Sequence, residues 1–326
     1  MTKLQRRRSA TRSVTKTAAP RAKAAGPARL TPFAGGWEAH KDRRCIWIVT
    51  PNNYPHSHAF DEVALAMQGA WQELGGSLPI VTEFKDFAGR SPIIYGGNLL
   101  PEEIIPHLPA DSVIINLEQV SDDSVWINAR YLTVLRNFPV LDYSARNRDR
   151  LTEKGIVHAG LLEIGYSPCL TRIAPAPVKD IDILFYGSLN KRRADILRAL
   201  QIAGLNVIHL FSVYGEQRDA AIARAKVVMN IHQFDSKVFE IVRVSYLLAN
   251  HVCVLTEGDP ADPDVKPLIE GLAVEPYETL IGRAIMLVAS EEDRRALAQN
   301  GFDIISRQSQ AEKLKSVMDA GAASPG

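Results

Sequence analysis

The segment from Asn230 to Glu257 constrains the fold of this chain more than any other part of its sequence. Its pattern, NIHQFDSKVFEIVRVSYLLANHVCVLTE, predicts the end of a strand, a short polar loop, a helix and a second strand. We expect Asp235 or Ser236 to cap the helix at its start. Because the helix is apolar on nearly every side, we expect it to be buried on more than one face. Such a unit is typical of an open α/β sheet.

Two charged residues, Glu240 and Arg243, interrupt this apolar helix. They are three positions apart, so a helix would place them on one face. In open α/β sheets, ligands bind where the strands end at their carboxyl edge. We therefore interpret Glu240 as an acceptor of hydrogen bonds from ligand hydroxyls, with Arg243 holding it in place or contacting phosphate. A structural ion pair between helix and sheet is the alternative.

Strand-like and helix-like segments alternate through both halves of the chain, which predicts an α/β fold with parallel sheets. In the first half, the predicted strands are 45–50, 78–81, 92–95, 112–117 and 139–143, and the predicted helices are 60–74, 102–107, 125–137 and 147–154. In the second half, the further strands are 181–186, 206–211, 226–231, 252–257 and 272–274, and the further helices are 194–203, 216–225, 277–289 and 311–318.

The Pro-rich segment IAPAPVKD at 173–180 is predicted to be a linker between two domains. We expect an N-terminal Rossmann-like domain at 43–172 and a C-terminal Rossmann-like domain at 181–305. A C-terminal helix and tail should occupy 306–326. Two such domains would face each other across a cleft at the carboxyl ends of their strands.

Residues 1–37 hold nine Lys or Arg residues and no Asp or Glu. Because the whole chain has 38 basic and 37 acidic residues, the remainder has an excess of eight acidic side chains. The segment is also rich in Ala, Thr, Ser and Pro, and we predict that it is a disordered basic tail. Its alternatives are a solvated tail without a partner, an arm that binds a polyanion, and a mitochondrial transit peptide.

The composition, with 46% hydrophobic and 23% charged residues, is typical of a soluble globular protein. No apolar run is long enough to span a membrane, and no apolar secretory signal begins the chain. The three cysteines, Cys45, Cys169 and Cys253, are far apart, which favours free thiols over disulfides or metal ligands. We expect a cytoplasmic protein, with peripheral attachment at the inner membrane as an alternative.

The motif GSLNKRR at 187–193 directly follows a predicted strand. Gly187 and Ser188 allow a tight turn, while Lys191, Arg192 and Arg193 place positive charge where a helix N-terminus already favours anions. The motif therefore predicts a site for a diphosphate, and a solvated basic helix start is the alternative. Neither a Walker A motif nor GxGxxG after a strand occurs.

Other polar residues also follow predicted strands. Tyr214 precedes a turn at Gly215, and Glu118 ends the strand 112–117. His56 and His58 lie after the first strand and just before a helix, where a histidine can act as a general base. The alternatives are an ordinary loop for Tyr214, a surface or capping carboxylate for Glu118, and a solvated loop for the histidines.

Metal-binding patterns such as HxxxH, CxxC and HExxH do not occur, so we expect no metal and no resident cofactor. Asp262 and Asp264 lie together in a Pro-rich loop and are weak candidates for metal ligands. A GxSxG motif is also missing, which argues against serine hydrolase chemistry.

Four segments of the second half resemble bacterial glycosyltransferases of the GT-B fold, and among them the CgeB/YkvP-like group with its group-1-type C-terminal domain. These segments are LFYGSLNKRR (184–193), YGEQRDAAIARAKVVMNIH (214–232), FEIVRVSYLLAN (239–250) and CVLTE (253–257). The resemblance runs more weakly through NLEQ, VLDYSARN and LEIGYSP of the first half, and covers about residues 43–300.

The resemblance implies two Rossmann-like domains that face a cleft, with the nucleotide-sugar donor on the second domain and the acceptor on the first. It implies that Glu240 binds ribose or sugar hydroxyls. The donor-binding candidates are Gly187, Ser188, Lys191, Arg192, Arg193, Tyr214, His232, Glu240 and Arg243. Many group-1 enzymes carry two glutamates eight residues apart in this region, and His232 stands at the earlier position here.

We therefore predict a metal-independent glycosyltransferase, a hexosyl- or related transferase, that moves a sugar from a nucleotide-sugar donor to a hydroxyl of a glycan, lipid or other acceptor. A base must deprotonate that hydroxyl, and the candidates are His56, His58 and Glu118. Positive charge must stabilise the departing diphosphate, which points to Lys191, Arg192, Arg193 and Arg243. A nucleotide-sugar epimerase and a non-catalytic nucleotide-sugar- or polyanion-binding protein are the alternatives.

Overall fold

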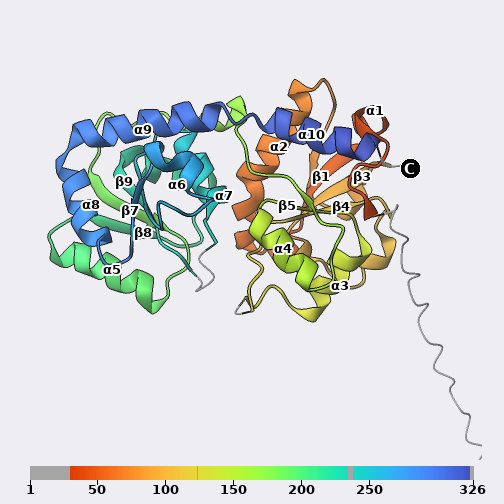
Figure 1. Ribbon diagram of the computed structural model, residues 1–326, viewed down its shortest axis with the longest axis horizontal. Coiled ribbons are helices and arrows are strands. Elements are labelled where there is room, and N and C mark those ends of the chain that lie inside the picture. The colour runs from red at the N-terminus through yellow and green to blue at the C-terminus, as the bar shows by residue number, and fades with distance from the viewer. Residues whose placement is uncertain (1–29, 123, 234–237, 324–326) are drawn as a thin grey trace, which may run out of the picture.

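The computed structural model contains two parallel β-sheets, each covered by helices, that lie side by side along the molecule (Figure 1). It describes residues 30–122, 124–233 and 238–323. The first sheet has the strand order β2-β1-β3-β4-β5-β6, and the second has the order β11-β10-β9-β7-β8. All pairings within both sheets are parallel, as the alternation of strands and helices predicts.

The first sheet is built from short strands, and the four central ones are almost entirely buried. Its strands are β1 (Arg44–Ile48), β2 (Ile80–Val81), β3 (Ser91–Tyr95), β4 (Val113–Asn116), β5 (Val140–Asp142) and β6 (Gly160–Leu161). Ile46 on β1 pairs with Ile80 on one side and Ile93 on the other, so β-branched side chains fill the centre of the sheet. The two-residue strand β6 was not predicted, because two residues carry no periodic signal.

Helices α1 (Gly36–His40), α2 (Asp61–Glu73), α3 (Ala129–Asn137) and α4 (Ala145–Glu153) accompany this sheet. Asn128 and Ser144 cap α3 and α4, since each side chain accepts a hydrogen bond from a backbone N–H of the first turn. The predicted helix at 102–107 is wrong: only a 3₁₀ turn forms at Ile105–His107. Proline at 101, 106 and 109 accounts for this, because proline cannot donate the hydrogen bonds of a helix interior.

The second sheet follows the predicted pattern closely. Its strands are β7 (Ile181–Tyr186), β8 (Val207–Leu210), β9 (Ala225–Asn230), β10 (Val254–Glu257) and β11 (Ala273–Glu275), and its helices are α5 (Lys191–Ile202), α6 (Gly215–Arg224), α7 (Ile241–Leu248), α8 (Leu280–Ala289) and α9 (Glu291–Ser306). The residues proposed as the cap of α7, Asp235 and Ser236, lie outside the described residues. Helix α7 starts later than predicted, with Glu240 at its N-cap position.

Helix α9, with 16 residues, was not predicted from the sequence. Its charged start, EEDRR, hides the apolar periodicity, and Gly301 lies in its interior. Gly301 is needed because α9 packs tightly on its neighbours: a Cβ added to Gly301 would lie 2.6 Å from Cδ2 of Leu248 and 3.0 Å from the carbonyl oxygen of Gly271. The cap at Ser290, which accepts from the N–H of Asp293, was the available signal.

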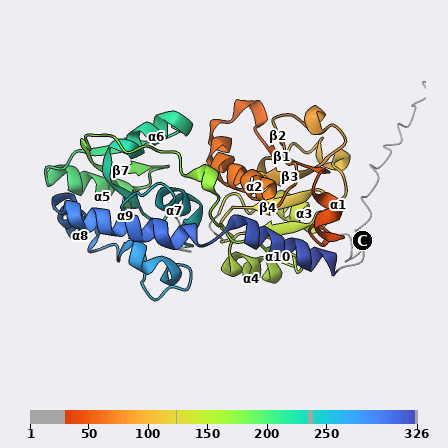
Figure 2. The same ribbon diagram turned by 90° about the horizontal axis from the view of Figure 1, so that it is seen from above.

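Helix α10 (Gln310–Ala322) returns from the second half to the first (Figure 1 and Figure 2). Leu314 and Met318 of α10 are buried in one hydrophobic cluster with Phe33 and Trp71 of the first half. The predicted C-terminal helix is therefore part of the packing of the N-terminal half.

The predicted disordered tail extends too far. Phe33 is 1% exposed and packs edge-on against Trp71, with ring centroids 5.9 Å apart, so residues 30–37 are not a tail. Burial of an aromatic ring strongly favours an ordered backbone. A prediction from the composition of a whole segment misses this effect, because it comes from one residue. All nine cations of the predicted tail lie in residues 1–29, outside the described residues.

Both sheets place their first strand between the second and the third, as β1 lies between β2 and β3 and β7 lies between β8 and β9. In such sheets the crevice for a ligand opens at the carboxyl ends of the strands, at this reversal of strand order. The segment 173–180, which joins the halves, forms neither helix nor strand, and within the described residues no helix is long and apolar enough to cross a bilayer.

Candidate active site

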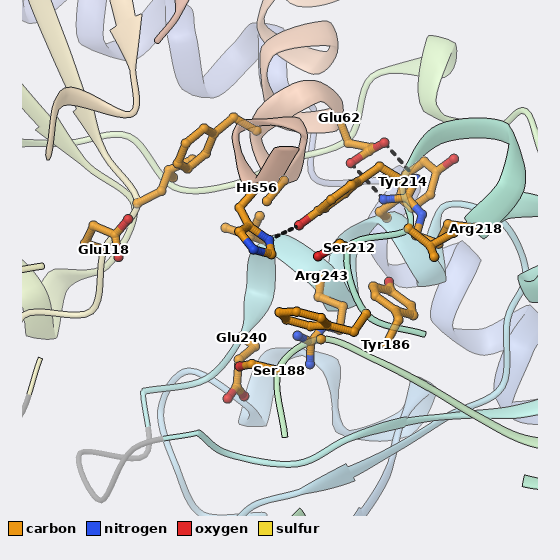
Figure 3. Close-up of a pocket in the computed structure, with 18 of the residues that line it drawn as sticks. His56, Glu62, Glu118, Tyr186, Ser188, Ser212, Tyr214, Arg218, Glu240 and Arg243 are labelled. Carbon is orange, nitrogen blue, oxygen red and sulfur yellow. Dashed lines mark hydrogen bonds and ion pairs between the residues drawn. The ribbon is translucent and has the colours of Figure 1, made fainter. Parts of the chain in front are cut away.

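A cavity of about 480 Å³ lies between the two halves at the carboxyl ends of their strands (Figure 3). Loops that follow β1, β3, β4 and β5 form its wall in the first half. Loops that follow β7 and β8, and the start of α7, form its wall in the second half. The two reversals of strand order therefore open into one shared space, as a tandem of such domains predicts.

Glu240 lines this cavity, and among the described residues only one of its two carboxylate oxygens has a hydrogen-bond partner. Its Oε2 atom accepts a hydrogen bond from Asn230 Nδ2 at 2.9 Å and lies 3.0 Å from His232 Nδ1. Its Oε1 atom is buried and has no hydrogen-bond partner among the described residues. The guanidinium of Arg193 lies 3.9 Å from it, too far for a hydrogen bond.

The pKa of Glu240 lies below its usual value, although burial alone would raise it. Burial is the largest single influence, but the interactions with His232, Arg243 and Asn230 together outweigh it. Glu240 is therefore ionised at neutral pH, and its Oε1 atom can only accept hydrogen bonds. An ionised oxygen left unpaired in a cavity is costly unless a ligand donates to it.

His232 does not line this cavity; it borders a smaller one of about 380 Å³ behind Glu240. It is 4% exposed, and its backbone N–H donates to Glu257 Oε2 at 3.1 Å. The position of His232 therefore does not favour the predicted direct contact with a donor. Its position instead fixes the orientation of Glu240.

Arg243 lies against the glycine turn that follows β7. Gly187 has φ +130°, and a Cβ at this residue would lie 3.0 Å from Nη2 of Arg243. The guanidinium also donates to Asn230 Oδ1 at 2.9 Å and lies over the ring of Tyr186, 5.2 Å from its centroid. Gly187, Ser188 and Arg243 all line the cavity, so they are the predicted diphosphate residues that the structure brings together.

Lys191 and Arg192 of the same motif do not line the cavity. Lys191 has a side chain that is 89% exposed and pairs with Asp195 at 2.6 Å. Arg192 forms a two-pronged ion pair with Glu257 and stacks on Tyr277, 3.9 Å from the ring centroid.

Arg193 also points away from the cavity, into the protein. It is 2% exposed and donates to the carbonyl oxygens of Ser188 and Ile231, which ties the two loops together. Helix α5 begins at Lys191, and consecutive residues of a helix point about 100° apart. Three adjacent cations therefore cannot all face one ligand, which the sequence motif alone does not reveal.

On the wall of the first half, His56 meets Tyr214 of the second half. Nδ1 of His56 lies 2.8 Å from the hydroxyl oxygen of Tyr214, and both residues line the cavity (Figure 3). His58, the second candidate base, does not line the cavity; it is exposed and lies 2.9 Å from Oδ2 of Asp61.

Glu118, the third candidate base, also lines the cavity. Burial raises its pKa to about 7, against the hydrogen bond that Asn98 donates at 3.1 Å. The backbone N–H of Glu118 donates to Oδ1 of Asn116, whose Nδ2 donates to Asp142 at 2.6 Å. This chain of buried hydrogen bonds holds the loop that carries Glu118.

The sequence did not predict the buried ion pair between Glu62 of α2 and Arg218 of α6, which also lines the cavity. Arg218 donates to both oxygens of Glu62, at 2.7 and 3.1 Å, and Arg172 contributes a third hydrogen bond at 3.1 Å. Arg218 is 4% exposed, so its charge is buried between the two halves. No local signal could reveal a partner 156 positions away.

Asp262 and Asp264, the weaker metal candidates, bind a cation of the protein itself. Nη2 of Arg146 lies 2.9 Å from Asp262 and 3.7 Å from Asp264, and this contact joins α4 to the loop after β10. Among the described residues, no group of three or more His, Cys, Asp or Glu side chains is placed to hold a metal ion. Independence of metal remains a prediction.

No protein-family model matches the chain. Among curated proteins, it is similar to uncharacterised proteins of Acanthamoeba polyphaga mimivirus. Protein L140 is 28% identical over 145 residues, which cover 41% of this chain and 44% of L140. Protein R358 is 30% identical over 162 residues, which cover 49% of this chain and 55% of R358. The matches therefore span about half of these relatives.

Solved structures of similar shape are glycosyltransferases. The chain is similar to AviGT4 of avilamycin A biosynthesis, with a TM-score of 0.54, 15% identity, and coverage of 86% of this chain and 98% of that one. It is similar to Anabaena HepE in complex with UDP and glucose, with a TM-score of 0.57, 10% identity, and coverage of 87% of this chain and 100% of that one. It is also similar to T4 phage BGT in complex with UDP-glucose, with a TM-score of 0.51, 10% identity, and coverage of 85% of this chain and 97% of that one. At such identities the likeness shows the fold, which is GT-B as predicted.

Proposed function

We propose that this GT-B protein is a glycosyltransferase that moves a sugar from a nucleotide-sugar donor to a hydroxyl acceptor. The observation that carries the proposal is Glu240, an ionised carboxylate whose Oε1 atom is buried beside the cavity without a described partner. A carboxylate oxygen in this state suits the hydroxyls of a ribose or a sugar, each of which can donate a charge-assisted hydrogen bond.

The diphosphate of the donor would lie between Glu240 and the turn after β7. Gly187 and Ser188 let the backbone approach a phosphate closely, and Arg243 supplies positive charge from below that turn. This assignment replaces Lys191, Arg192 and Arg193, which have other partners. Because HepE and BGT have been solved with UDP and glucose or with UDP-glucose, we propose a UDP-sugar as the first donor to test.

The acceptor would enter from the wall of the first half, where a base must remove the proton of its hydroxyl. Glu118 and His56 line that wall, and the pKa of about 7 suits Glu118 to accept a proton near neutral pH. His56 is the second candidate, oriented by Tyr214. We also propose that the transfer needs no metal ion and that the protein belongs with the CgeB/YkvP-like glycosyltransferases.

A thermal-shift screen against nucleoside diphosphates and nucleotide sugars tests the donor site, since a ligand that binds the folded state raises the melting temperature. We expect a shift with UDP and a larger one with its sugar conjugate. Glu240→Gln should weaken this binding at least about tenfold, because a charged hydrogen bond contributes roughly 1.5–3 kcal/mol. Exposed Glu270→Gln is the matched control.

The donor site would be disproved if no nucleotide shifts the wild-type protein, or if Glu240→Gln binds as the wild type does. Turnover separates the functions that share this site. Transfer to an added acceptor, unaffected by excess EDTA, supports a metal-independent glycosyltransferase. Conversion of the donor sugar without any acceptor would instead identify an epimerase.

A further inference from the structure

A second cavity, of about 850 Å³, lies at the opposite end of the second sheet, where β7, β9 and β10 begin. The linker 173–180 forms one side, and the end of α6, the first half of α9 and the loop before β10 form the others. We call it the linker cavity. Its lining includes Pro175, Pro177, Lys179, Lys226, Arg294 and Arg295.

Two cations of the linker cavity are bound by carbonyl oxygens alone. Nζ of Lys179 donates to the carbonyl oxygens of Ala223 and Ala225, at 3.2 and 2.9 Å. Nη1 of Arg294 donates to those of residues 287 and 288, at 2.6 and 2.7 Å. Neither cation has a carboxylate partner among the described residues. An ammonium has three N–H groups and a guanidinium has five, so both retain donors for a ligand.

The other charges of the linker cavity cancel one another. Lys226 pairs with Asp182 at 2.7 Å, and Arg295 pairs with Glu291, one turn earlier in α9. The carbonyl groups that hold Lys179 and Arg294 belong to the C-terminal ends of α6, including its C-cap Ala225, and of α8. A helix C-terminus carries about half a negative charge, so two of them leave an excess of about one positive charge in the cavity.

These two cations also repel each other. Desolvation, together with the charge of Arg294, lowers the pKa of Lys179. An anion bound between them would remove this repulsion. The cavity is much larger than a phosphate ion, and Pro175, Pro177 and Val252 provide an apolar part of its wall.

We propose that the linker cavity is a second binding site, for a small organic molecule that carries a phosphate group. Lys179 and Arg294 would hold the phosphate, and the apolar wall would take the organic part. A phosphate dianion suits a point charge and a planar guanidinium that approach from different elements. This site is at the far end of the sheet from Glu240, and the inference does not depend on the proposed transferase activity.

Isothermal titration of the full chain with inorganic phosphate and with glycerol 3-phosphate, at constant ionic strength set by chloride, tests the proposal. We expect glycerol 3-phosphate to bind more tightly than inorganic phosphate. Lys179→Gln and Arg294→Gln should each raise both Kd values at least about tenfold. Lys315→Gln, which removes an exposed cation of α10, is the matched control.

The candidate active site can also bind phosphate, so the titration is repeated with Arg243→Gln. Binding that survives Arg243→Gln but is weakened by Lys179→Gln supports the linker cavity, whatever the donor screen shows. Binding that is abolished by Arg243→Gln, or that is equal in the wild type and both cavity variants, overturns the proposal. Because Arg294 also caps α8, the Lys179→Gln result decides the case if Arg294→Gln does not fold.

Discussion

The guanidinium of Arg218 donates hydrogen bonds to both carboxylate oxygens of Glu62, at 2.7 and 3.1 Å, and so joins the two halves of the protein beside the central cavity. Both residues are nearly inaccessible to water, with exposures of 4% and 7%. A buried ion pair of this kind is sensitive to the loss of either partner, since the remaining charge is left without compensation. The relative position of the two walls therefore depends on this contact.

Arg218→Met should destabilise the protein by about 3 kcal/mol, at the lower end for a broken buried pair because Arg172 still contacts Glu62. Removing both charges with Glu62→Gln and Arg218→Met should cost less than the sum of the single changes. Urea unfolding of the four proteins measures this coupling. Strictly additive losses would show that the contact between the halves contributes nothing.

The position of Arg243 predicts a contrast between two cations near β7. Arg243→Gln should weaken the binding of UDP at least about tenfold, because it removes a charged donor from the cavity wall. Lys191→Gln should change it less than about twofold, because an exposed ion pair contributes little. Titration with UDP measures both. A larger effect from Lys191 would restore the interpretation of GSLNKRR as the diphosphate site.

His232 predicts a dependence of donor binding on pH. Its hydrogen bond keeps the pKa of Glu240 below the usual 4.5, so wild-type binding should be flat between pH 5 and 8. In His232→Ala, burial prevails and the pKa of Glu240 rises, so binding should weaken as the pH falls. His232→Asn, which retains an N–H donor, should restore the flat profile. A loss of affinity that is equal at every pH would mean that His232 only supports the fold.

The depressed pKa of Glu240 also predicts how the stability of the fold depends on pH. Because the pKa of Glu240 is depressed in the folded state, the stability that its charge contributes is present above about pH 4.5 and is lost as the pH falls through the lower folded value. His232→Ala should therefore reduce the melting temperature more at pH 7 than at pH 4.

Glu118 predicts the opposite dependence of stability on pH. Its pKa is raised to about 7 in the folded state, so the folded protein favours the protonated form. Glu118→Gln should raise the melting temperature at pH 8, where the wild type must bury a charge, and have little effect at pH 4. If Glu118 is the base, kcat/KM should rise with pH through about 7, and the variant should lose at least about a hundredfold. Exposed Glu103→Gln is the control.

Two truncations separate the basic segment from the fold. Deleting residues 1–29 should leave the melting temperature and donor binding unchanged, whereas deleting 1–36 should lower the melting temperature by removing Phe33 from the core. Loss of a buried phenylalanine typically costs about 3–5 kcal/mol. Equal melting temperatures for the two truncations would contradict the burial of Phe33.

The same truncations test binding to a polyanion. Residues 1–29 contain nine cations, so affinity of the full chain for DNA or anionic vesicles should fall steeply between 50 and 200 mM salt. The shorter protein should bind weakly at both concentrations. Equal and salt-independent binding would show that the nine cations have no such role.

The sequence predicted the alternation of strands and helices because it depends on local periodicity, and Glu240 because a charge within an apolar segment is conspicuous. Helix α9 was missed because its charged start hides the apolar periodicity and because Gly301 in its interior is explained only by Gly271 and Leu248, which are remote in the sequence. The directions of Lys191, Arg192 and Arg193 could not be predicted without the start of α5. The ion pair of Glu62 with Arg218 depends on tertiary packing alone.

The return of α10 to the first half has a consequence for synthesis of the protein. Leu314 and Met318 complete a core whose other members include Phe33 and Trp71, which are translated long before α10. On the ribosome, the first half must wait for the second half to emerge before its own apolar surface is covered. Nascent chains that stop before α10 would expose Trp71 and should be substrates for chaperones, even though the second half can already form its own sheet.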